Sequence, residues 1–372
     1  MFGTFRVLTM RKYKATTFID TFSSKDFSRV QLMLANSLPR MYEITLGDIL
    51  EVKYEETTSR SGAQVLEVNY IGEIIHSKNQ LLYKSKQSAK LDDIRKECLY
   101  NSINGGRHLL IWKFKYEFSR SIRDLLSSRG FVDVITPIVM EDSGTSTVQP
   151  MKVVSNFGGE GYLKITHELE LKKIYYITLT PVFEIGELTR DVYSTQFGVN
   201  EFLSLEYVAP VGHINMLELI KSIISLAKSI AERLHLDYNK DFAKLEIKDL
   251  ECSETECGDS ASTVYLKLVT DSPLVKTAST GSKTEFKWKY GLKTIAHGYI
   301  DENQSDIISE LFAQQQKSLK EKGIKAKTDK KYLEILGYSS PSSESFNLGI
   351  DRFIQFFLNL DTAYHVHNIL GI

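Results

Sequence analysis

The sequence predicts an α+β protein in which a small β-barrel precedes a larger domain with an antiparallel sheet flanked by helices. Short segments with period-two alternation crowd into the first 80 residues. Beyond residue 107, strands and long amphipathic helices follow one another without βαβ regularity, which favours an antiparallel sheet. We therefore expect a barrel over residues 1–80, a linker over 81–107 and the larger domain over 108–372.

The N-terminal segment carries β-branched and aromatic residues at alternating positions. Turn signals at LGD (46–48) and SRSG (59–62) separate expected strands over 15–22, 29–35, 48–57 and 63–75. An open sheet of this size would leave its edge strands unprotected, so we expect a closed barrel of the OB type. The polar stretch that follows, rich in Lys, Ser and Asn, is typical of a linker.

The larger domain begins with residues 112–130, whose apolar side chains recur at helical spacing up to Gly130. Further helices are expected over 216–235 and 305–323. Strands are expected over 131–140, 161–167, 180–188, 200–209 and 289–301, and a strand turning into a buried helix over 347–360. Residues 252–284 carry little pattern, and the Lys-rich segment 322–331 is typical of an exposed loop.

Bulk composition restricts the function only loosely. The formal net charge of -1 gives no general attraction to nucleic acid, although a local basic face is compatible with it. Three cysteines, Cys98, Cys252 and Cys257, leave one unpaired in any disulfide scheme and suit a reducing compartment. The sequence lacks a signal peptide and the roughly 20-residue apolar run of a membrane helix, so we expect a cytoplasmic protein without a membrane partner.

Common nucleotide-binding loops are absent from the sequence, so phosphate binding would depend on arginines and backbone amides. Arg190 follows the expected strand 180–188 in a hairpin whose loop could fold over a nucleotide, and Arg352 lies where a strand gives way to a buried helix. A buried arginine is costly unless it meets an anion. The alternative for each is an internal salt bridge, for instance between Arg352 and Asp351.

Three acidic residues, Glu168, Glu206 and Asp301, are candidates for binding an ammonium group, because they lie on or beside the expected strands of one sheet. The alternative is that they pair internally with Lys164, Lys172 or Arg190. Phe202, on the hairpin strand, is a candidate for stacking on a purine, although an aromatic residue in a strand is more often part of the core.

Taken in order, these segments resemble the lysyl-tRNA synthetases over nearly the whole chain. The resemblance rests on RVQLM and LGDILEVKYEETTSRSGAQVLEV in the barrel, and on SIRDLLSSRGFVDVITPIVM, which is similar to motif one with its proline, Pro137. GYLKITHELELKK, VFEIGELTRD and NEFLSLEY are similar to the substrate strand and motif two, and SESFNLGIDRFIQFF to motif three. The resemblance implies a class II synthetase-like antiparallel sheet, and a homodimer formed through motif one.

The resemblance also implies residue roles, with an amino acid, ATP and Mg²⁺ as ligands. Arg190 looks like the motif-two arginine that holds the α-phosphate and the substrate carboxylate, Phe202 like the aromatic residue under adenine, and Arg352 like the arginine facing the γ-phosphate. The amino-acid pocket that the family builds corresponds here to Gly144, Glu168, Glu206, His297, Tyr299 and Asp301.

Several positions depart from the family pattern. The acid expected two positions after Arg190 is replaced by Val192, and an Arg-His pair in the following loop by Phe197 and Gly198. The two glutamates that hold Mg²⁺ in the family align with Lys287 and Thr294, with Glu285 close to the first of these positions. No metal ligand is predicted, and the Mg²⁺ site looks degraded. His297 and Asp301 occupy the positions where the family has an asparagine and a glutamate. Val208 occupies the position of a tyrosine.

Three hypotheses follow. The first is a repurposed ligase that activates an amino acid as its adenylate and transfers it to tRNA or another acceptor, such as a protein or a small molecule. The second is a catalytically inactive paralogue that binds a partner and regulates it, and the third is a strongly diverged lysyl-tRNA synthetase. The barrel favours a nucleic-acid partner mildly, but RVQLMLANSL has few aromatic residues for reading an anticodon.

Overall fold

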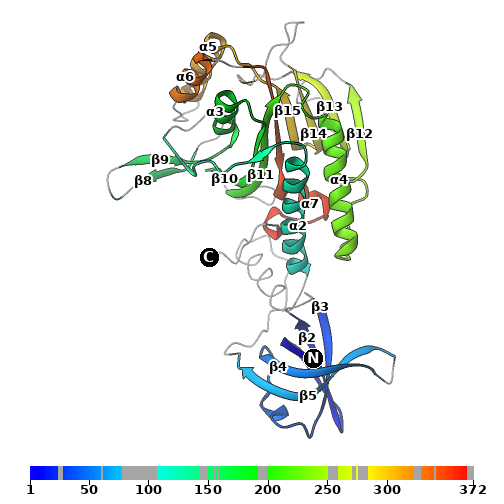
Figure 1. Cartoon of the computed structure of the whole chain (residues 1–372). Helices are drawn as coiled ribbons and strands as arrows, with labels where there is room; N and C mark the ends of the chain where they lie inside the picture. The colour runs from blue at the N-terminus through cyan, green and yellow to red at the C-terminus, as the bar shows by residue number, and fades with distance from the viewer. Residues whose placement is uncertain are drawn as a thin grey trace. The chain divides into compact units, whose positions relative to one another are not determined.

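The computed structural model describes residues 1–23, 28–59, 62–77, 107–141, 150–154, 156, 159–191, 199–249, 259–269, 274, 284–321, 328–338 and 341–366. Two compact units are built mainly on Met1–Lys113 and Phe114–His367 (Figure 1). The expected linker lies outside the described residues except for residue 107, and the domain limits stay a prediction. Among the described helices, none has the length and apolar character needed to cross a membrane.

The N-terminal unit is a closed barrel with the strand order β1-β2-β3-β5-β4. Its strands are β1 (Phe2–Lys12), β2 (Thr16–Ser23), β3 (Ser28–Ala35), β4 (Ile49–Thr58) and β5 (Gln64–Ile75), with a short helix η1 (Met41–Glu43). β3 and β5 pair in parallel, and the antiparallel pair of β1 and β4 closes the barrel. Gly47 and Gly62, in the two predicted turns, adopt positive φ angles of 90° and 83°, which glycine tolerates without steric cost.

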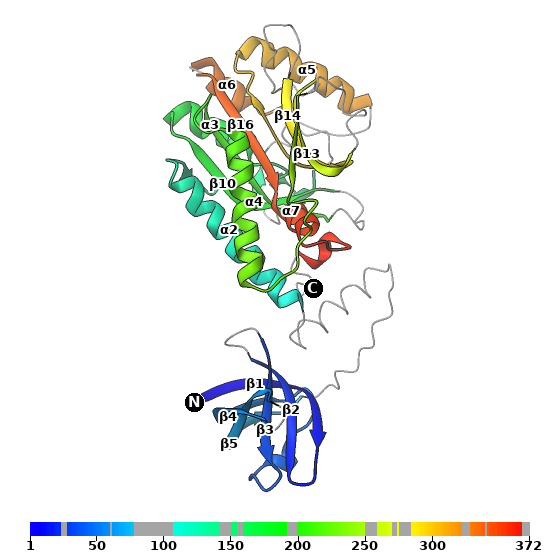
Figure 2. The same ribbon diagram turned by 90° about the vertical axis from the view of Figure 1, so that its right-hand side faces the viewer.

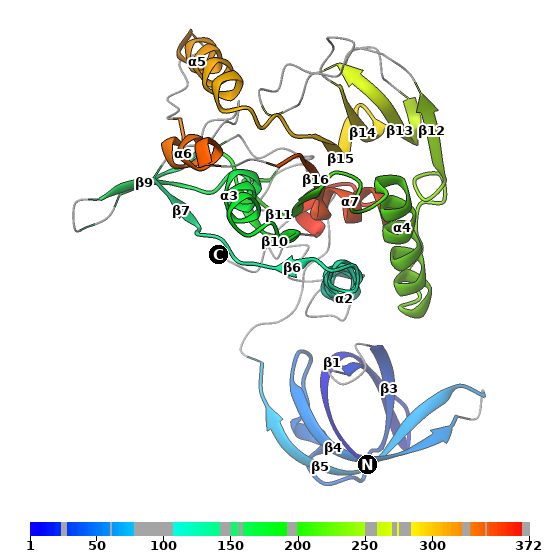
Figure 3. The same cartoon turned by 45° about the horizontal axis from the view of Figure 1, so that its top comes forward.

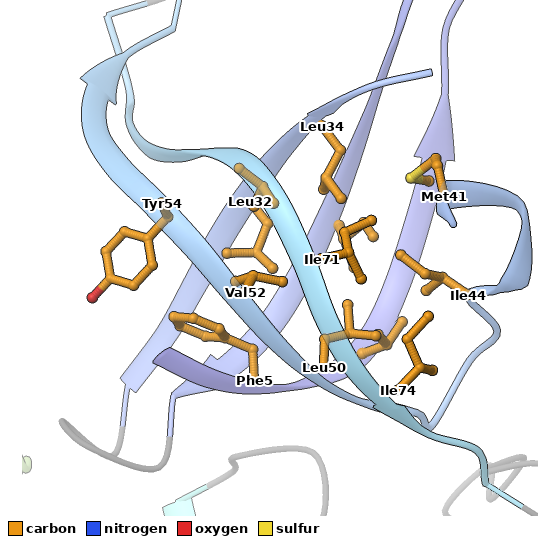
Figure 4. Packing of buried hydrophobic residues seen from close by; sticks show 13 residues of the cluster. Phe5, Leu32, Leu34, Met41, Ile44, Leu50, Val52, Tyr54, Ile71 and Ile74 are labelled. Atoms are coloured by element: carbon orange, nitrogen blue, oxygen red, sulfur yellow. The ribbon is translucent and has the colours of Figure 1, made fainter. Parts of the chain in front are cut away.

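Alternate side chains of these strands fill the barrel interior, as Figure 4 shows for Phe5, Leu32, Val52 and Ile71. β2 alternates strictly between half-buried and buried positions, which is the pattern of a strand with one face on a core. Each such side chain contributes about 1.5–3 kcal/mol on burial. The predicted OB-type barrel is confirmed, with β1 added to the expected strands.

The larger unit is built on an eight-stranded sheet with the order β12-β13-β14-β15-β16-β11-β10-β6. The bounds are β6 (Val132–Asp133), β10 (Val182–Thr189), β11 (Glu201–Pro210), β12 (Leu245–Asp249), β13 (Asp259–Val269), β14 (Thr284–Gly291), β15 (Lys293–Ile300) and β16 (Ser343–Gly349). Strands β7 (Val139–Met140), β8 (Lys152–Val154) and β9 (Glu160–Leu163) form a small separate sheet. The large sheet is antiparallel except at its two outer pairs, β12–β13 and β10–β6, so the predicted class is confirmed.

Helices of the larger unit gather in two groups. α2 (Arg107–Ser127), α4 (Met216–Arg233) and α7 (Ile350–Phe357) lie together in Figure 2. The rings of Phe118 and Phe353 join α2 to α7, with centroids 4.8 Å apart, and Arg233 joins α4 to α2 through Glu117 at 2.6 Å. The other group, α3 (Glu168–Thr178), α5 (Ser305–Glu321) and α6 (Lys330–Tyr338), gathers at another part of the sheet (Figure 3).

Three predicted strands are wrong in their extent, and one of them, expected over 161–167, ends at Leu163 as β9. The expected strand 131–140 is split into β6 and β7, because Thr136 between them turns inward to bond a buried carboxylate. The expected strand 289–301 is a hairpin, since β14 ends at Gly291, whose φ of 55° turns the chain into β15. Elements not predicted include α3, α6, β12 and β13, and Glu168 therefore begins a helix instead of lying beside a strand.

Candidate functional site

A row of polar side chains crosses one face of the large sheet. Residues directly opposite one another in register share a face, since side chains alternate along each strand. The row consists of Lys248, Tyr265, Lys287, His297, Asn347, Glu206 and Glu184. The neighbouring row, which faces the other way, is buried and apolar over Val264, Trp288, Ala296, Leu348, Leu205 and Ile185. The polar row thus runs from a basic end on β12–β14 to an acidic end on β11–β10.

Glu206 lies near the acidic end of this row and is buried. Its Oε2 accepts hydrogen bonds from Thr166 Oγ1 and the His167 backbone amide, both at 2.8 Å, and its Oε1 accepts one from Asn347 Nδ2 at 2.7 Å. Burial raises the pKa of Glu206. Among the described residues no ammonium or guanidinium lies at ion-pair distance from Glu206, and the charge of Arg190 attracts it only from farther away.

Glu168 and Asp301, in contrast, share one internal cation. Lys172 Nζ lies 2.7 Å from Glu168 Oε1 and 3.0 Å from Asp301 Oδ1. The Tyr299 hydroxyl also donates to Glu168 Oε1. The structure therefore brings Glu168, Tyr299 and Asp301 together, and for these two acids the alternative of internal pairing with Lys172 is confirmed.

His297 stands between the acidic and basic halves of the row. Its ring stacks on Tyr299, with centroids 5.8 Å apart and an interplanar angle of 15°. Burial lowers the pKa of His297 to about 4, against the attraction of Glu168, so the imidazole is neutral at pH 7. Its strand neighbour Lys287 also has a lowered pKa, about 8, because of burial and the nearby charge of Lys289.

Arg190 and Phe202 meet at the loop end of the β10–β11 hairpin. The Arg190 guanidinium lies over the Phe202 ring, 4.8 Å from its centroid, in a cation–π contact. The Arg190 backbone amide donates to Asn200 O at 2.8 Å, which closes the hairpin ladder. Within the described part of the chain, Arg190 forms no ion pair, and its buried Nε has no hydrogen-bond partner. The predicted arginine and aromatic residue are therefore neighbours.

Arg352, in the first turn of α7, is only partly buried and donates from Nη1 to Thr294 O at 2.9 Å. The alternative of a salt bridge with Asp351 is wrong, because Asp351 pairs with Lys115 at 2.7 Å and accepts the Leu203 amide at 3.1 Å. No carboxylate in the described ranges forms an ion pair with Arg352. Its guanidinium is therefore a second cation without an internal counter-ion.

A buried ion cluster that the sequence did not predict lies beside the acidic end of the row. Glu184 Oε1 pairs with Lys164 Nζ at 2.8 Å, and its Oε2 accepts from Thr136 Oγ1 at 2.6 Å and lies 3.1 Å from His167 Nδ1. Although burial opposes it, His167 and Lys164 lower the pKa of Glu184 to about 2. Since the His167 amide also bonds Glu206, this cluster fixes the position of Glu206.

Some predicted positions lie outside the described residues. These are Gly144, Val192, Phe197 and Gly198. Of the two positions aligned with metal-binding glutamates, Lys287 is a buried ammonium and Thr294 contributes its carbonyl to Arg352. In the part of the chain that the structure describes, no group of three His, Cys, Asp or Glu side chains could hold a metal ion. An ammonium group cannot ligate a metal ion, and the Thr294 carbonyl already accepts from Arg352, so these two positions do not replace the paired carboxylates of a Mg²⁺ site.

The sequence of this chain is similar to those of known tRNA ligases. The chain matches the family model described as tRNA synthetases class II (D, K and N) over residues 95–367. The lysine–tRNA ligase of Saccharolobus solfataricus is 24% identical over 422 aligned positions, which cover 95% of this chain and 83% of that protein. The lysine–tRNA ligase of Thermosipho melanesiensis is 27% identical over 268 positions, covering 66% of this chain and 52% of the relative.

An aspartate–tRNA(Asp/Asn) ligase of Archaeoglobus fulgidus is also similar, at 22% identity over 298 positions that cover 72% of this chain and 69% of that protein. The chain spans only about half the length of the Thermosipho relative, 52%.

Proposed function

Since the chain belongs to the class II tRNA synthetases (D, K and N), we propose that it activates an amino acid with ATP and transfers the aminoacyl group to tRNA or another acceptor. The observation that carries this proposal is the pair Arg190 and Arg352. Both side chains are partly buried, and neither forms an ion pair among the described residues. Burying an unpaired charge lowers the stability of the folded protein, and binding of an anionic ligand would offset that desolvation cost.

The polyphosphate of a nucleotide supplies the matching charge. Guanidinium groups bind phosphate oxygens through paired N–H donors, and the buried Nε of Arg190 has such a donor to offer. Phe202 presents an aromatic face beside Arg190, on which an adenine ring would stack. Arg190, Phe202 and Arg352 therefore form the proposed ATP site.

The acidic end of the row supplies the amino-acid site. Within the described ranges Glu206 has no cation at ion-pair distance, and an α-ammonium group would provide one. This places the substrate carboxylate towards the two arginines. In the proposed reaction a carboxylate oxygen attacks the α-phosphorus, the bond from that phosphorus to the bridging oxygen breaks, and pyrophosphate leaves. A nucleophile of the acceptor then attacks the carbonyl carbon of the adenylate, and AMP leaves.

Arg190 and Arg352 would stabilise the charge that develops on the phosphates, and holding both reactants in one row supplies proximity. A single hydrogen-bond donor of this kind lowers the activation free energy by about 3 kcal/mol in measured cases. The residues at the two metal-aligned positions do not fit Mg²⁺, so every role in the proposed reaction is assigned to side chains of this chain.

The test is ATP–pyrophosphate exchange measured with each amino acid in turn. We expect exchange that depends on one amino acid or a small group, and a loss of at least about 100-fold in Arg190→Ala. Arg120→Ala is the matched control, since Arg120 is exposed on α2 and makes only a 3.9 Å contact with Asp124. Absence of exchange with every amino acid, in folded protein, would contradict the proposal and favour an inactive paralogue that binds a partner.

A further inference from the structure

Two buried lysines lie at the basic end of the polar row. Lys287 and Lys289 are two residues apart on β14, so their side chains project from the same face of the sheet, and they are 8% and 6% exposed. Burial and the charge of Lys289 lower the pKa of Lys287 to about 8, and burial lowers the pKa of Lys289. At pH 7 most molecules therefore carry the Lys287 charge, and its lysine neighbour adds repulsion to the cost of burial.

The two arginines of the proposed ATP site belong to the same electrostatic environment. Both Lys287 and Arg190 lower the pKa of His297, which lies opposite Lys287 on β15. Arg190 in turn lowers the pKa of Arg352, and Arg352 donates to the carbonyl of Thr294, which pairs in register with the second lysine. These cations form a basic cluster that consists of Arg190, Arg352, Lys287 and Lys289.

Buried polar atoms without hydrogen-bond partners adjoin the basic cluster. Thr263, on β13, lies directly opposite Lys289 and projects from the same face. Its side chain is fully buried, and within the described part of the chain its Oγ1 has no hydrogen-bond partner. The buried Nε of Arg190 has none there either. Buried polar atoms are rarely left unbonded, so both atoms indicate that a polar ligand completes this part of the site.

The polar row is long enough to hold an amino acid and a polyphosphate end to end. Glu206 on β11 and Lys287 on β14 are separated by the two strands β16 and β15. That separation is roughly 14 Å at about 4.8 Å from strand to strand. With the α-ammonium at Glu206 and the α-phosphate at Arg190, the β- and γ-phosphates would extend towards the two lysines.

The charge of the basic cluster opposes the binding of a divalent cation. Mg²⁺ takes oxygen ligands, above all carboxylates, whereas the basic cluster presents ammonium and guanidinium groups. Among the side chains that the structure describes, no group of three His, Cys, Asp or Glu could hold a metal ion. A polyphosphate without bound metal carries its full negative charge, and it accepts charge-assisted hydrogen bonds from every member of the cluster.

We propose that Lys287 and Lys289 bind the β- and γ-phosphates of ATP in place of Mg²⁺, so that the site takes the nucleotide in its metal-free form. This inference rests on the proposed function and extends its ATP site beyond Arg190, Phe202 and Arg352. The two lysines act as phosphate-binding residues, and the Thr263 hydroxyl donates a further hydrogen bond to a phosphate oxygen.

The wild-type protein tests the inference without any substitution. ATP binding is measured by calorimetry in EDTA and in excess Mg²⁺, at the same ionic strength. We expect ATP to bind at least about tenfold more tightly in EDTA, because Mg²⁺ neutralises part of the phosphate charge that the basic cluster recognises. Equal or tighter binding in Mg²⁺ would overturn the inference and leave the proposed function standing.

Lys287→Met and Lys289→Met each remove one charge and keep most of the side-chain volume. Each variant should bind metal-free ATP about tenfold more weakly and AMP within about twofold of wild type, since AMP lacks the β- and γ-phosphates. Equal weakening of both nucleotides would show a structural role and overturn the inference. Lys221→Met is the matched control, because Lys221 is exposed on α4 and pairs only with Glu218 on the same helix, and it should bind both nucleotides as wild type does.

Inorganic tripolyphosphate distinguishes failure of the inference from failure of the proposed function. If ATP binds in neither EDTA nor Mg²⁺, the proposed function is contradicted, and metal-free tripolyphosphate then tests the basic cluster by itself. Binding that Lys287→Met weakens would support a polyphosphate site at the two lysines, and absence of binding would overturn it. If the lysine variants do not fold, the comparison of EDTA with Mg²⁺ in wild type decides alone.

Discussion

Burial and the positive charge of Arg190 together lower the pKa of the Arg352 guanidinium. The two cations repel one another, and among the described carboxylates Glu206 attracts Arg190 without forming an ion pair with it. A fold selected for stability alone would pair them, as it pairs the neighbouring Asp351 with Lys115. The relationship between Arg190 and Arg352 is therefore the feature of this site that most directly requires an anionic ligand.

Stability should depend on the titration of His297. Its pKa is about 4 in the folded protein and 6.5 when unperturbed, so between these values the unfolded chain holds a proton that the folded chain does not. Stability is consequently fully present above about pH 6.5 and falls as the pH is lowered towards 4. Denaturant unfolding of wild type should lose about 2 kcal/mol more between pH 7 and pH 4.5 than His297→Asn does.

The matched control for that experiment is His235→Asn. His235 is exposed after α4 and has a positive φ of 52°, a conformation that asparagine tolerates. It should reproduce the pH profile of wild type. Identical profiles for wild type and His297→Asn would show that His297 titrates normally, in contradiction to its neutral state in the site.

The buried Glu184 cluster should dominate stability near the acidic end of the row. Glu184→Gln leaves Lys164, 3% exposed, without its counter-ion, and we expect a loss of about 3–5 kcal/mol in the free energy of unfolding. Glu232→Gln, at an exposed position on α4, should change stability by no more than about 0.5 kcal/mol.

The pH dependence of the same cluster has a definite sign. The pKa of Glu184 is lowered from 4.5 to about 2, so its contribution is complete above about pH 4.5 and is lost as the pH falls towards 2. Wild type should show this acid transition, and Glu184→Gln should lack it. A Glu184→Gln variant as stable as wild type would mean that the cluster has no net effect.

An apolar ridge around β7 should form a homodimer interface. Ile135, Ile138 and Val139 are 92%, 66% and 53% exposed, and they lie in the segment similar to motif one. Large apolar residues grouped on a surface indicate an interaction site. We expect a dimer at micromolar concentration in sedimentation velocity, and a monomer for Ile135→Asp.

The control for the dimer prediction is Ile177→Asp, since Ile177 is 68% exposed at the end of α3, outside that ridge. It should remain dimeric with the same sedimentation coefficient as wild type. A monodisperse monomer for wild type would refute the prediction of a homodimer.

The barrel strands were predictable because each has one face on a core, which imposes a period of two on the sequence. Helix α3 was not predictable in the same way. Its segment HELELKK reads as a solvated surface, whereas Lys172 and Leu171 are fully buried. A charged residue enters a core only when its partners come from elsewhere in the chain, and Asp301 is far away in sequence.

For the site, the family resemblance indicated Arg190, Phe202, Glu206 and Arg352. The structure places Phe202 and Glu206 on one face of the sheet and Arg190 over the Phe202 ring, and Arg352 on α7 is close enough to Arg190 to feel its charge. A carboxylate is paired with an internal cation only if the helices and strands of the fold bring that cation close to it. No local sequence pattern could therefore predict that Asp301 is paired with a lysine and that Glu206 is not. The one available signal was the i,i+4 spacing of Glu168 and Lys172, which becomes an ion pair on a helix.

Whether Arg352 binds a nucleotide is tested by ATP affinity measured together with thermal stability in Arg352→Met, with Arg120→Met as the control. If the Arg352 guanidinium binds a phosphate of ATP, ATP should bind about 10- to 100-fold more weakly to Arg352→Met. The reason is that a charge-assisted hydrogen bond contributes about 1.5–3 kcal/mol to the binding free energy. Tm should stay equal or rise, because repulsion from Arg190 is relieved. Unchanged ATP affinity together with a lower Tm would contradict the account, since Arg352 would then serve the fold and not a nucleotide.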